Sequence, residues 1–297
     1  MAVTLIRFEI EEERIRVRLE DYLSIRFPDL SRMYLRDVIK SGNCEVNGRI
    51  ENKGKRVSSG DFIEIELDRD RETAMRPEDS PVEILYEDDD LAVVNKPSGM
   101  LVHPTHWQRT GTLLNALSFH FNREKQNGVI RPGLVHRLDS ETSGLIVVAK
   151  NHRSHRALAS QFQRRTVSKR YLAVVEGGLQ NENGVIDSPI GRYVDEKRWD
   201  VMPGAKPSLT KYQVIESFKT STLLELEPVT GRTNQLRIHC ASIGHPILGD
   251  VNRGGRAFRR LCLHAFRLRF RHPSHGNELE FTTIPPDWSK SLSNIDQ

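Results

Sequence analysis

The chain has 297 residues and a mass of 34.0 kDa, which favours a small domain joined to a larger one and leaves ample length for a buried core. Its composition, 37% hydrophobic and 28% charged, is typical of a soluble globular protein, and no apolar stretch is long enough to span a bilayer. The net charge of +4 is unevenly distributed, because residues 1–75 have 14 basic and 16 acidic side chains whereas residues 91–297 have 29 and 17.

This charge asymmetry indicates where a polyanion would bind. Seven arginines and no acid occur between Arg253 and Arg271. Because neutralisation of phosphates dominates nucleic-acid affinity, we expect a polyanion to be attracted to the second domain. The alternative is that these charges form only a solvated face.

The N-terminus and the cysteines indicate the compartment. Residues 1–20 carry acids every few positions and have no apolar signal core, so we expect neither secretion nor organelle import and place the protein in the cytoplasm. The isolated Cys44, Cys240 and Cys262 support neither a disulfide framework nor a zinc knuckle. We expect them to be small buried side chains in a reducing compartment.

The first two predicted elements are helices. Leu19 and Leu23 lie on one face of a helical pattern. Ser31 can N-cap a second helix over residues 32–40, which Gly42 is placed to end. Each helix would bury one face against a neighbouring element.

A hairpin and a strand follow these helices. Asn47 and Gly48 form the strongest two-residue hairpin signal between two short apolar arms. The alternating strand after it places Ile63, Ile65 and Leu67 on one face. Together these elements predict a compact two-helix unit capped by a small sheet.

Residues 18–67 resemble the alpha-L RNA-binding domain, the S-four type named after a ribosomal protein of the small subunit. The matching features are the Arg18-Leu19 opening, the Ser31-Arg32 helix start, the turn SGNCEVNG and the late Gly60-Asp61. Glu20 stands where that family usually has Asp.

This resemblance implies that residues 14–70 form an RNA-binding domain that docks on structured RNA. Arg32, Arg36 and Lys40 would lie on its contact helix. The alternative is that these three residues are only solvated helix charges, since this part of the chain is slightly acidic.

The second domain is predicted to be α+β. Residues 71–81 are polar and end on Pro81, so they form a linker, and the second domain covers residues 82–290. Strand-like runs recur in it: VEILYE, LAVVNKP, LIVVAK, RYLAVVEGG, KYQVIESF, STLLELEPV and CLHAFRLRF. Two helical patterns interrupt them, over residues 111–124 and 152–165. Many strands with few helices favour a mainly antiparallel mixed sheet over a doubly wound parallel one.

Asp139 is the first candidate for chemistry. It lies in HRLDSETSGL, after strand-like residues and before the turn residues 140–144. A loop flanked by strands is where a rigid scaffold presents a catalytic group. An Asp before Ser and Thr is, however, often a turn residue that bonds its own backbone, so both readings stay open from this segment alone.

Other segments supply groups that suit a nucleotide site. GRTNQLRIHC contains Arg232 and Arg237, and Tyr171 stands at the start of a strand after Lys169 and Arg170. An arginine can hold an acid ionised, and an aromatic face can stack on a flipped base.

Four segments in this order resemble the RluA-type pseudouridine synthases, from residue 19 to about residue 286 with the RNA-binding domain included. They are KPSGMLVHP, HRLDSETSGL with the following LIVVAK, KRYLAVVEG, and GRTNQLRIHCASIGHPILGD, and RLCLHAFRLRFRHP follows them. The resemblance implies a mainly antiparallel catalytic domain and the conversion of uridine in RNA to its carbon-linked isomer, without a cofactor.

The resemblance also assigns the catalytic residues. Asp139 matches the catalytic aspartate, acting either as nucleophile at the sugar or as base on the neighbouring sugar proton. Tyr171 matches the tyrosine that stacks on the target base, and Arg232 matches the arginine that pairs with the acid. Without the family, Tyr171 would be an ordinary strand tyrosine.

The remaining matched residues would bind the substrate. Arg137 matches the residue that helps to flip the base and fills the gap in the RNA. Leu236 matches an apolar residue on the other face of the uracil, although core packing would explain it equally well. His136 and Arg237 complete the candidate substrate-binding set, and His136 would hold the loop together with Leu138.

Two positions depart from the family pattern. Asn234 stands where the family usually has His, and Arg253 stands where it usually has Tyr. They put in doubt the fine positioning of the site and its RNA preference more than the reaction type.

Rival functions have weaker support. A metal-dependent hydrolase would rely on the pairs His103/His106 and His152/His155, but no HExxH form is present, so we expect no metal. An RNA methyltransferase would need a Gly-rich cofactor loop, which is absent. A catalytically silent RNA-binding or ribosome-assembly protein remains the alternative from another class.

The expected partner is RNA, with large-subunit ribosomal RNA or an assembling ribosomal subunit as the first choice and transfer RNA as the second. We expect a monomer with no membrane association.

Overall fold

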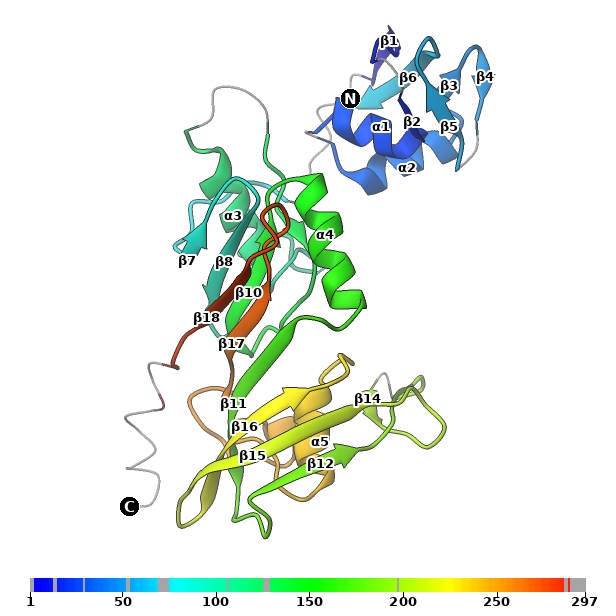
Figure 1. Cartoon of the computed structure of the whole chain (residues 1–297). Helices are drawn as coiled ribbons and strands as arrows, with labels where there is room; N and C mark the ends of the chain where they lie inside the picture. The colour runs from blue at the N-terminus through cyan, green and yellow to red at the C-terminus, as the bar shows by residue number, and fades with distance from the viewer. Residues whose placement is uncertain are drawn as a thin grey trace.

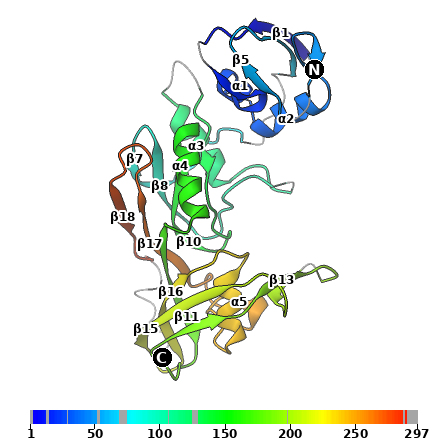
Figure 2. The same cartoon turned by 45° about the vertical axis from the view of Figure 1, so that its right-hand side comes forward.

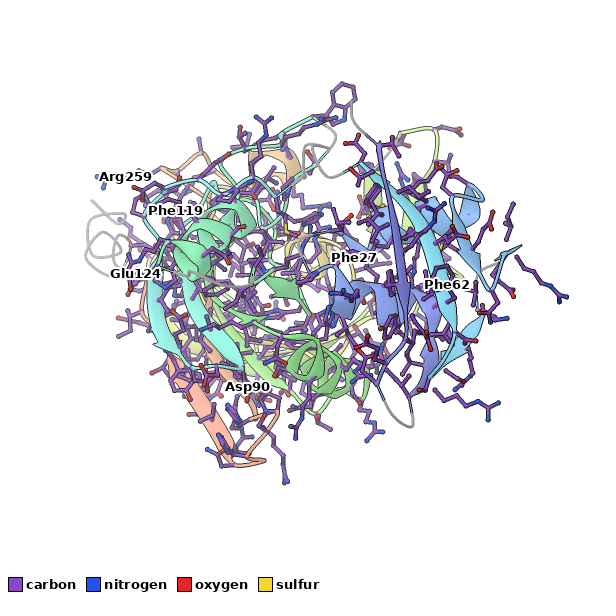
Figure 3. The ribbon with its side chains drawn as sticks, turned by 90° about the horizontal axis from the view of Figure 1, so that it is seen from above. Phe27, Phe62, Asp90, Phe119, Glu124 and Arg259 are labelled. Carbon is purple, nitrogen blue, oxygen red and sulfur yellow. The ribbon has the colours of Figure 1, made fainter. Side chains whose placement is uncertain are left out.

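The computed structural model shows two units, each with its own hydrophobic core (Figure 1). It describes residues 3–12, 15–28, 30–51, 54–68, 75–105, 107–124, 129–196, 198–285 and 288. Seen from above, Phe27 and Phe62 lie with the N-terminal unit on one side, and Asp90 and Phe119 lie with the second unit on the other (Figure 3). The two units therefore fold around separate apolar clusters.

The N-terminal unit packs two helices on a small sheet. Its elements are β1 (Val3–Glu9), β2 (Arg16–Arg18), α1 (Leu19–Arg26), α2 (Arg32–Lys40), β3 (Cys44–Val46), β4 (Arg49–Ile50), β5 (Arg56–Ser58) and β6 (Phe62–Asp68). One sheet has the strand order β1-β6-β3-β4, and β2 pairs with β5. The two predicted helices, the hairpin and the last strand are confirmed, whereas β1 was not predicted.

The capping and turn signals of this unit act as expected. The Ser31 hydroxyl accepts a hydrogen bond from the Tyr34 backbone N–H at 3.1 Å. Gly42 has a φ of +79°, and Asn47 and Gly48 have φ of +52° and +71°, which are the left-handed values that a helix end and a tight hairpin require.

The second unit is built on one large sheet. Its elements are β7 (Glu83–Glu87), β8 (Leu91–Lys96), α3 (Leu113–Asn122), β9 (Gly133–Leu134), β10 (Ser143–Ala149), α4 (His152–Gln163), β11 (Ser168–Glu176), β12 (Asn183–Asp187), β13 (Ile190–Tyr193), β14 (Arg198–Val201), β15 (Leu209–Ser217), β16 (Ser221–Pro228), α5 (Gln235–Ser242), the 3-10 turn η1 (Val251–Arg253), β17 (Leu263–Arg271) and β18 (Glu278–Thr282). The ten-stranded sheet has the order β12-β15-β16-β11-β17-β10-β8-β7, with β18 on β17 and β9 on β10.

The strand directions confirm the α+β expectation. Within the described residues, every pairing in the large sheet is antiparallel except that of β10 with β17. Helix α5 and strands β12, β13, β14 and β18 were not predicted. Figure 2 shows α3 and α4 beside β8 and β10, and α5 beside β15 and β16.

Strand β10 is buried along its whole length, which makes it the centre of the core. Ile146 and Val148 belong to the same apolar cluster as Leu117 of α3. Their neighbours Leu145 and Val147 belong to a second cluster that contains Leu158 of α4. Because side chains alternate along a strand, α3 and α4 cover opposite faces of the sheet.

The cysteines, the linker and the helices were also the subject of expectations from the sequence. Cys44, Cys240 and Cys262 are free and buried, as predicted. Of the expected linker, residues 75–81 contain neither helix nor strand, and residues 71–74 lie outside the described part. In the described part of the chain, none of the helices has the length and apolar character needed to cross a membrane.

Candidate active site

A pocket of about 560 Å³ opens beside the loop that precedes β10. Its walls come from residues 136–142, the start of β11, and the segment from the end of β16 into α5. The pocket brings together these predicted site residues: His136, Arg137, Asp139, Tyr171, Arg232, Leu236 and Arg237. Arg32, Arg36 and Lys40 lie elsewhere, on or beside α2 of the N-terminal unit.

The Asp139 loop is fixed by a buried lysine. Lys96, which is fully buried, donates from Nζ to the carbonyl oxygens of Pro97 and Met100 at 2.8 Å each and of Ser140 at 2.9 Å. The Thr142 N–H also donates to the Asp139 carbonyl at 3.1 Å, which closes a turn. One ammonium group therefore ties the Lys-Pro turn to the loop that carries Asp139.

Burial and hydrogen bonding act in opposite directions on the charge of Lys96. Burial lowers the pKa of Lys96 to about 7, and the nearby charge of Asp139 opposes that shift. Its three hydrogen bonds to carbonyl oxygens all need N–H donors, so they favour the ammonium form.

His136 holds the same loop against the core. Its Nε2 accepts a hydrogen bond from the Val147 backbone N–H at 3.1 Å, and its ring stacks on Phe162 with centroids 4.4 Å apart. Burial lowers the pKa of His136 to about 3, so the ring is neutral at physiological pH. These contacts fit the loop-holding role that we expect for His136.

Asp139 lies partly buried at the pocket wall. Burial raises the pKa of its carboxyl, while the positive charges of Arg237, Arg137 and Lys96 act in the opposite direction. No hydrogen bond or ion pair of the carboxylate is found within the described residues. The carboxylate is therefore available to a bound substrate.

Tyr171 enters the pocket at an irregularity of β11. The pairing of β11 with β17 shifts between Arg170 and Tyr171, and such bulges re-aim a side chain. Tyr171 is 9% exposed, and both burial and the Asp139 charge raise the pKa of its phenol. The phenol is therefore protonated at neutral pH.

Arg237 and Arg232 contact different groups of the protein. Arg237 is 7% exposed; its Nε and Nη2 donate to the buried Asp250 carboxylate at 2.7 Å each, and its Nη1 donates to Glu141 at 2.5 Å. Arg232 donates to the Pro207 carbonyl at 3.3 Å. In this structure Arg237 is thus the arginine that joins α5 to the Asp139 loop, and the pairing of Arg232 with Asp139 stays a prediction.

The position of Asn234 explains one departure from the family pattern. Asn234 is the N-cap of α5 and has φ 53° and ψ 23°, the left-handed conformation. Asn and His are both among the residues enriched there, so the exchange preserves the backbone turn. Leu236, in the first turn of the helix, is 7% exposed and belongs to the main core, so it both packs in the core and lines the pocket.

Arg253, Arg36 and Arg32 all bind other groups of the protein. Arg253 donates to the Trp199 carbonyl at 3.0 Å. Arg36 donates to both oxygens of the buried Glu20 carboxylate at 3.0 Å, and Arg32 pairs with Asp21. Two of the three predicted RNA contacts on α2 are therefore partly neutralised.

Sequence reasoning did not select four further residues of this region. Phe162 and Lys169 line the pocket, and Glu141 and Asp250 bind Arg237. Lys169 could have been found from the Lys-x-Tyr pattern, and Glu141 from its place in the Asp139 segment. Asp250 could have been found as the last residue of the segment GRTNQLRIHCASIGHPILGD. No local signal marks Phe162, because its contact with His136 joins separate parts of the chain.

The described residues contain no group of three or more His, Cys, Asp or Glu side chains that could hold a metal ion. A second carboxylate, Glu227, lines the pocket, but it pairs with Arg170 at 3.0 Å. A pocket with one unpaired acid, one tyrosine and several arginines has the composition of a site that handles a nucleotide.

Comparison with known proteins assigns the class. The family model for RNA pseudouridylate synthase matches residues 90–242, and the chain belongs to this family. It is therefore an RNA pseudouridine synthase, as the sequence resemblance implied.

Relatives match along nearly the whole chain. An uncharacterized RNA pseudouridine synthase of Aquifex aeolicus is 38% identical over 97% of this chain and 96% of that protein. The ribosomal large subunit pseudouridine synthase D of Pasteurella multocida is 37% identical over 97% of this chain and 94% of that protein. The solved structure of human RNA pseudouridylate synthase domain containing 1 matches with a TM-score of 0.59 and 30% identity, over 73% of this chain and 86% of that chain.

Proposed function

We propose that the protein isomerises specific uridines to pseudouridine in large-subunit ribosomal RNA and that Asp139 is the catalytic carboxylate. The observation that supports this most is the meeting of Asp139, Tyr171 and Arg137 in one pocket of about 560 Å³. That volume lies in the range of sites for small ligands, so it suits one nucleotide taken out of its stack. Several relatives bear the name ribosomal large subunit pseudouridine synthase D, which supports this choice of RNA.

The reaction places simple demands on the pocket. The bond between the ribose and the ring nitrogen breaks, the uracil turns while it is held, and ring carbon five bonds to the same sugar carbon. Ring carbon five then loses its proton, and the released ring nitrogen gains one. Asp139 starts this sequence either by attack on the sugar or by removal of the neighbouring sugar proton. Hydrolysis of a glycosidic bond usually uses two carboxylates, and here the second one, Glu227, is occupied by Arg170.

The other residues hold the nucleotide. Tyr171 stacks on the uracil, Leu236 covers its other face, and Arg137 helps to displace the base from the RNA. Arg232 is proposed to pair with Asp139 once substrate is bound. Arg32, Arg36 and Lys40 are proposed to dock the N-terminal unit on structured RNA.

The test uses purified protein with transcripts of large-subunit ribosomal RNA and of transfer RNA, followed by chemical mapping of pseudouridine. We expect modification of ribosomal RNA at discrete uridines, and a loss of at least ~10³-fold in rate for Asp139→Asn. Glu227→Gln is the matched control, since it neutralises the other pocket carboxylate and should keep most of the activity.

Three results would contradict the proposal. An active Asp139→Asn variant would remove the catalytic assignment. Modification of transfer RNA alone would replace the substrate, while protein that binds ribosomal RNA without modifying it would support a role in binding or ribosome assembly.

A further inference from the structure

Helix α4 links the two units of the molecule and ends at the pocket. Its first residue, His152, contacts the backbone of Ser24 in α1. Burial lowers the pKa of His152, and the hydrogen bond with the Ser24 backbone opposes this shift because it favours the protonated ring. At the other end, Phe162 and Arg165 line the pocket. Figures 1 and 2 show α4 running from the side of the N-terminal unit toward β11.

The exposed face of α4 is basic. Arg153, Arg156 and Arg164 are exposed, and their spacing places them along one side of the helix. No hydrogen bond or ion pair of these three side chains is found within the described residues. We call these three residues together with Arg165 the α4 stripe.

The helix contains no acidic residue that could offset this charge. Arg153 and Arg156 lie in its first half, where the helix dipole disfavours positive charge. Asp90, which binds the Asn151 and Ser154 side chains, supplies one acid from outside at the end of the helix. The like charges of the stripe therefore destabilise the helix slightly.

Arg165 also breaks a local backbone rule. It follows the C-cap of α4 with a φ of 57°, and its N–H donates to the Phe162 carbonyl at 3.2 Å. Gly is the usual residue at this position, because a side chain there is strained. The side chain is exposed at the pocket and has no hydrogen-bonding or ionic partner in the described chain. Backbone strain of this kind is characteristic of functional sites.

The arginines of the C-terminal region are placed differently. Arg256 pairs with Glu176 at 2.9 Å, and Arg269 lies 3.5 Å from Glu278. Arg267 lies 4.0 Å from Glu280. Three of the seven arginines between Arg253 and Arg271 therefore lie near acids of neighbouring strands, whereas no acid pairs with the α4 stripe in the described part of the chain.

We infer that the α4 stripe binds the RNA backbone between the N-terminal unit and the pocket, with Arg165 holding the phosphate next to the target nucleotide. Guanidinium groups suit phosphate oxygens because they offer several donors in a fixed plane. This inference rests on the proposed reaction site, since the stripe leads to that pocket.

Arg165→Gly is the sharpest test, because it should change stability and RNA binding in opposite directions. Relief of the left-handed strain should raise the melting temperature by about 2–4 °C. Loss of the phosphate contact should raise KM for the RNA about three- to tenfold with kcat unchanged, and reduce the salt dependence of binding by about one ion. Arg165→Lys keeps the charge and should retain most of the binding.

The rest of the stripe is tested by Arg153→Gln/Arg156→Gln against the matched control Arg267→Gln/Arg269→Gln. Both remove two positive charges, so a general charge effect would weaken binding equally. We expect a clear loss of affinity and about two fewer ions in the salt dependence for the first pair only.

Binding is measured in the Asp139→Asn background, so that it does not depend on turnover. The inference would be overturned if Arg165→Gly left the RNA affinity unchanged, or if Arg165→Lys lost as much affinity as Arg165→Gly. It would also be overturned if the control pair lost as much affinity as Arg153→Gln/Arg156→Gln. An active Asp139→Asn protein would instead defeat the proposed function and leave the binding result interpretable.

Discussion

Asp139 is an acid placed where its charge is costly. Burial raises the pKa of its carboxyl, and the surrounding arginines and Lys96 only partly offset this. The proposed reaction needs the carboxylate, so at neutral pH the folded protein would maintain a charge that its own environment disfavours. This is the pattern of a residue retained for chemistry at the expense of stability.

A stability measurement checks this account of Asp139. Because the folded pKa is raised, the ionised carboxyl destabilises the fold above that pKa, and the penalty disappears as the pH falls below the unfolded value near 3.9. We expect Asp139→Asn to melt at a higher temperature than wild type at neutral pH, with the difference shrinking on acidification. A variant that is less stable at pH 7, or a difference that does not vary with pH, would contradict it.

At the scale of elements, the arrangement of the site depends on the close parallel pairing of β10 with β17. Gly144, in the segment that follows Asp139, has φ +112°, and a Cβ there would lie 2.4 Å from the Ala265 carbonyl oxygen. The two strands pair in parallel at Ser143 and Gly144, and β17 also pairs with β11 beside Tyr171. A glycine thus lets β10, which follows the Asp139 loop, and β11, which carries Tyr171, both pair with β17.

Gly144→Ala should therefore be strongly destabilising, by at least ~3 kcal/mol, since both the backbone conformation and the space exclude a methyl group. Gly178→Ala is the matched control, because a Cβ at Gly178 meets no atom within 4 Å, and it should change stability by no more than about 0.5 kcal/mol. Denaturant unfolding of the two variants measures this difference. Equal stabilities would show that β10 and β17 can move apart enough to accommodate the methyl group, which would contradict this prediction.

The elements that the sequence predicted are those with local signals. Ser31 caps α2, Asn47 and Gly48 form the hairpin, and β11 and β16 are apolar runs. Helix α5 was missed because six of its eight residues are buried, including polar ones, so it has no amphipathic pattern. Its left-handed N-cap, Asn234, also makes no capping bond.

The site divides in the same way. Asp139, Tyr171 and Arg137 line one pocket, and family motifs marked all three in the sequence. The contact of Arg237 with Glu141 joins residues 96 positions apart, and Lys96 reaches Ser140 across 44 positions. Such long-range contacts are set by tertiary packing and have no local sequence signal.

At the scale of the whole molecule, the charge asymmetry gains a location. The second unit carries the excess of basic residues, but three of the seven arginines between Arg253 and Arg271 lie near acids. On α4 no such pairs are found in the described part of the chain, and this helix leads from the N-terminal unit to the pocket. One unit is proposed to dock on structured RNA while the other modifies a uridine.

The measurement that tests the central claim most directly is a map of pseudouridine in RNA from cells that lack this protein, complemented with wild type or with Asp139→Asn. We predict that discrete sites in large-subunit ribosomal RNA are lost, return with wild type, and stay absent with the variant. Restoration of every missing site by Asp139→Asn would contradict the claim that this carboxylate carries the reaction.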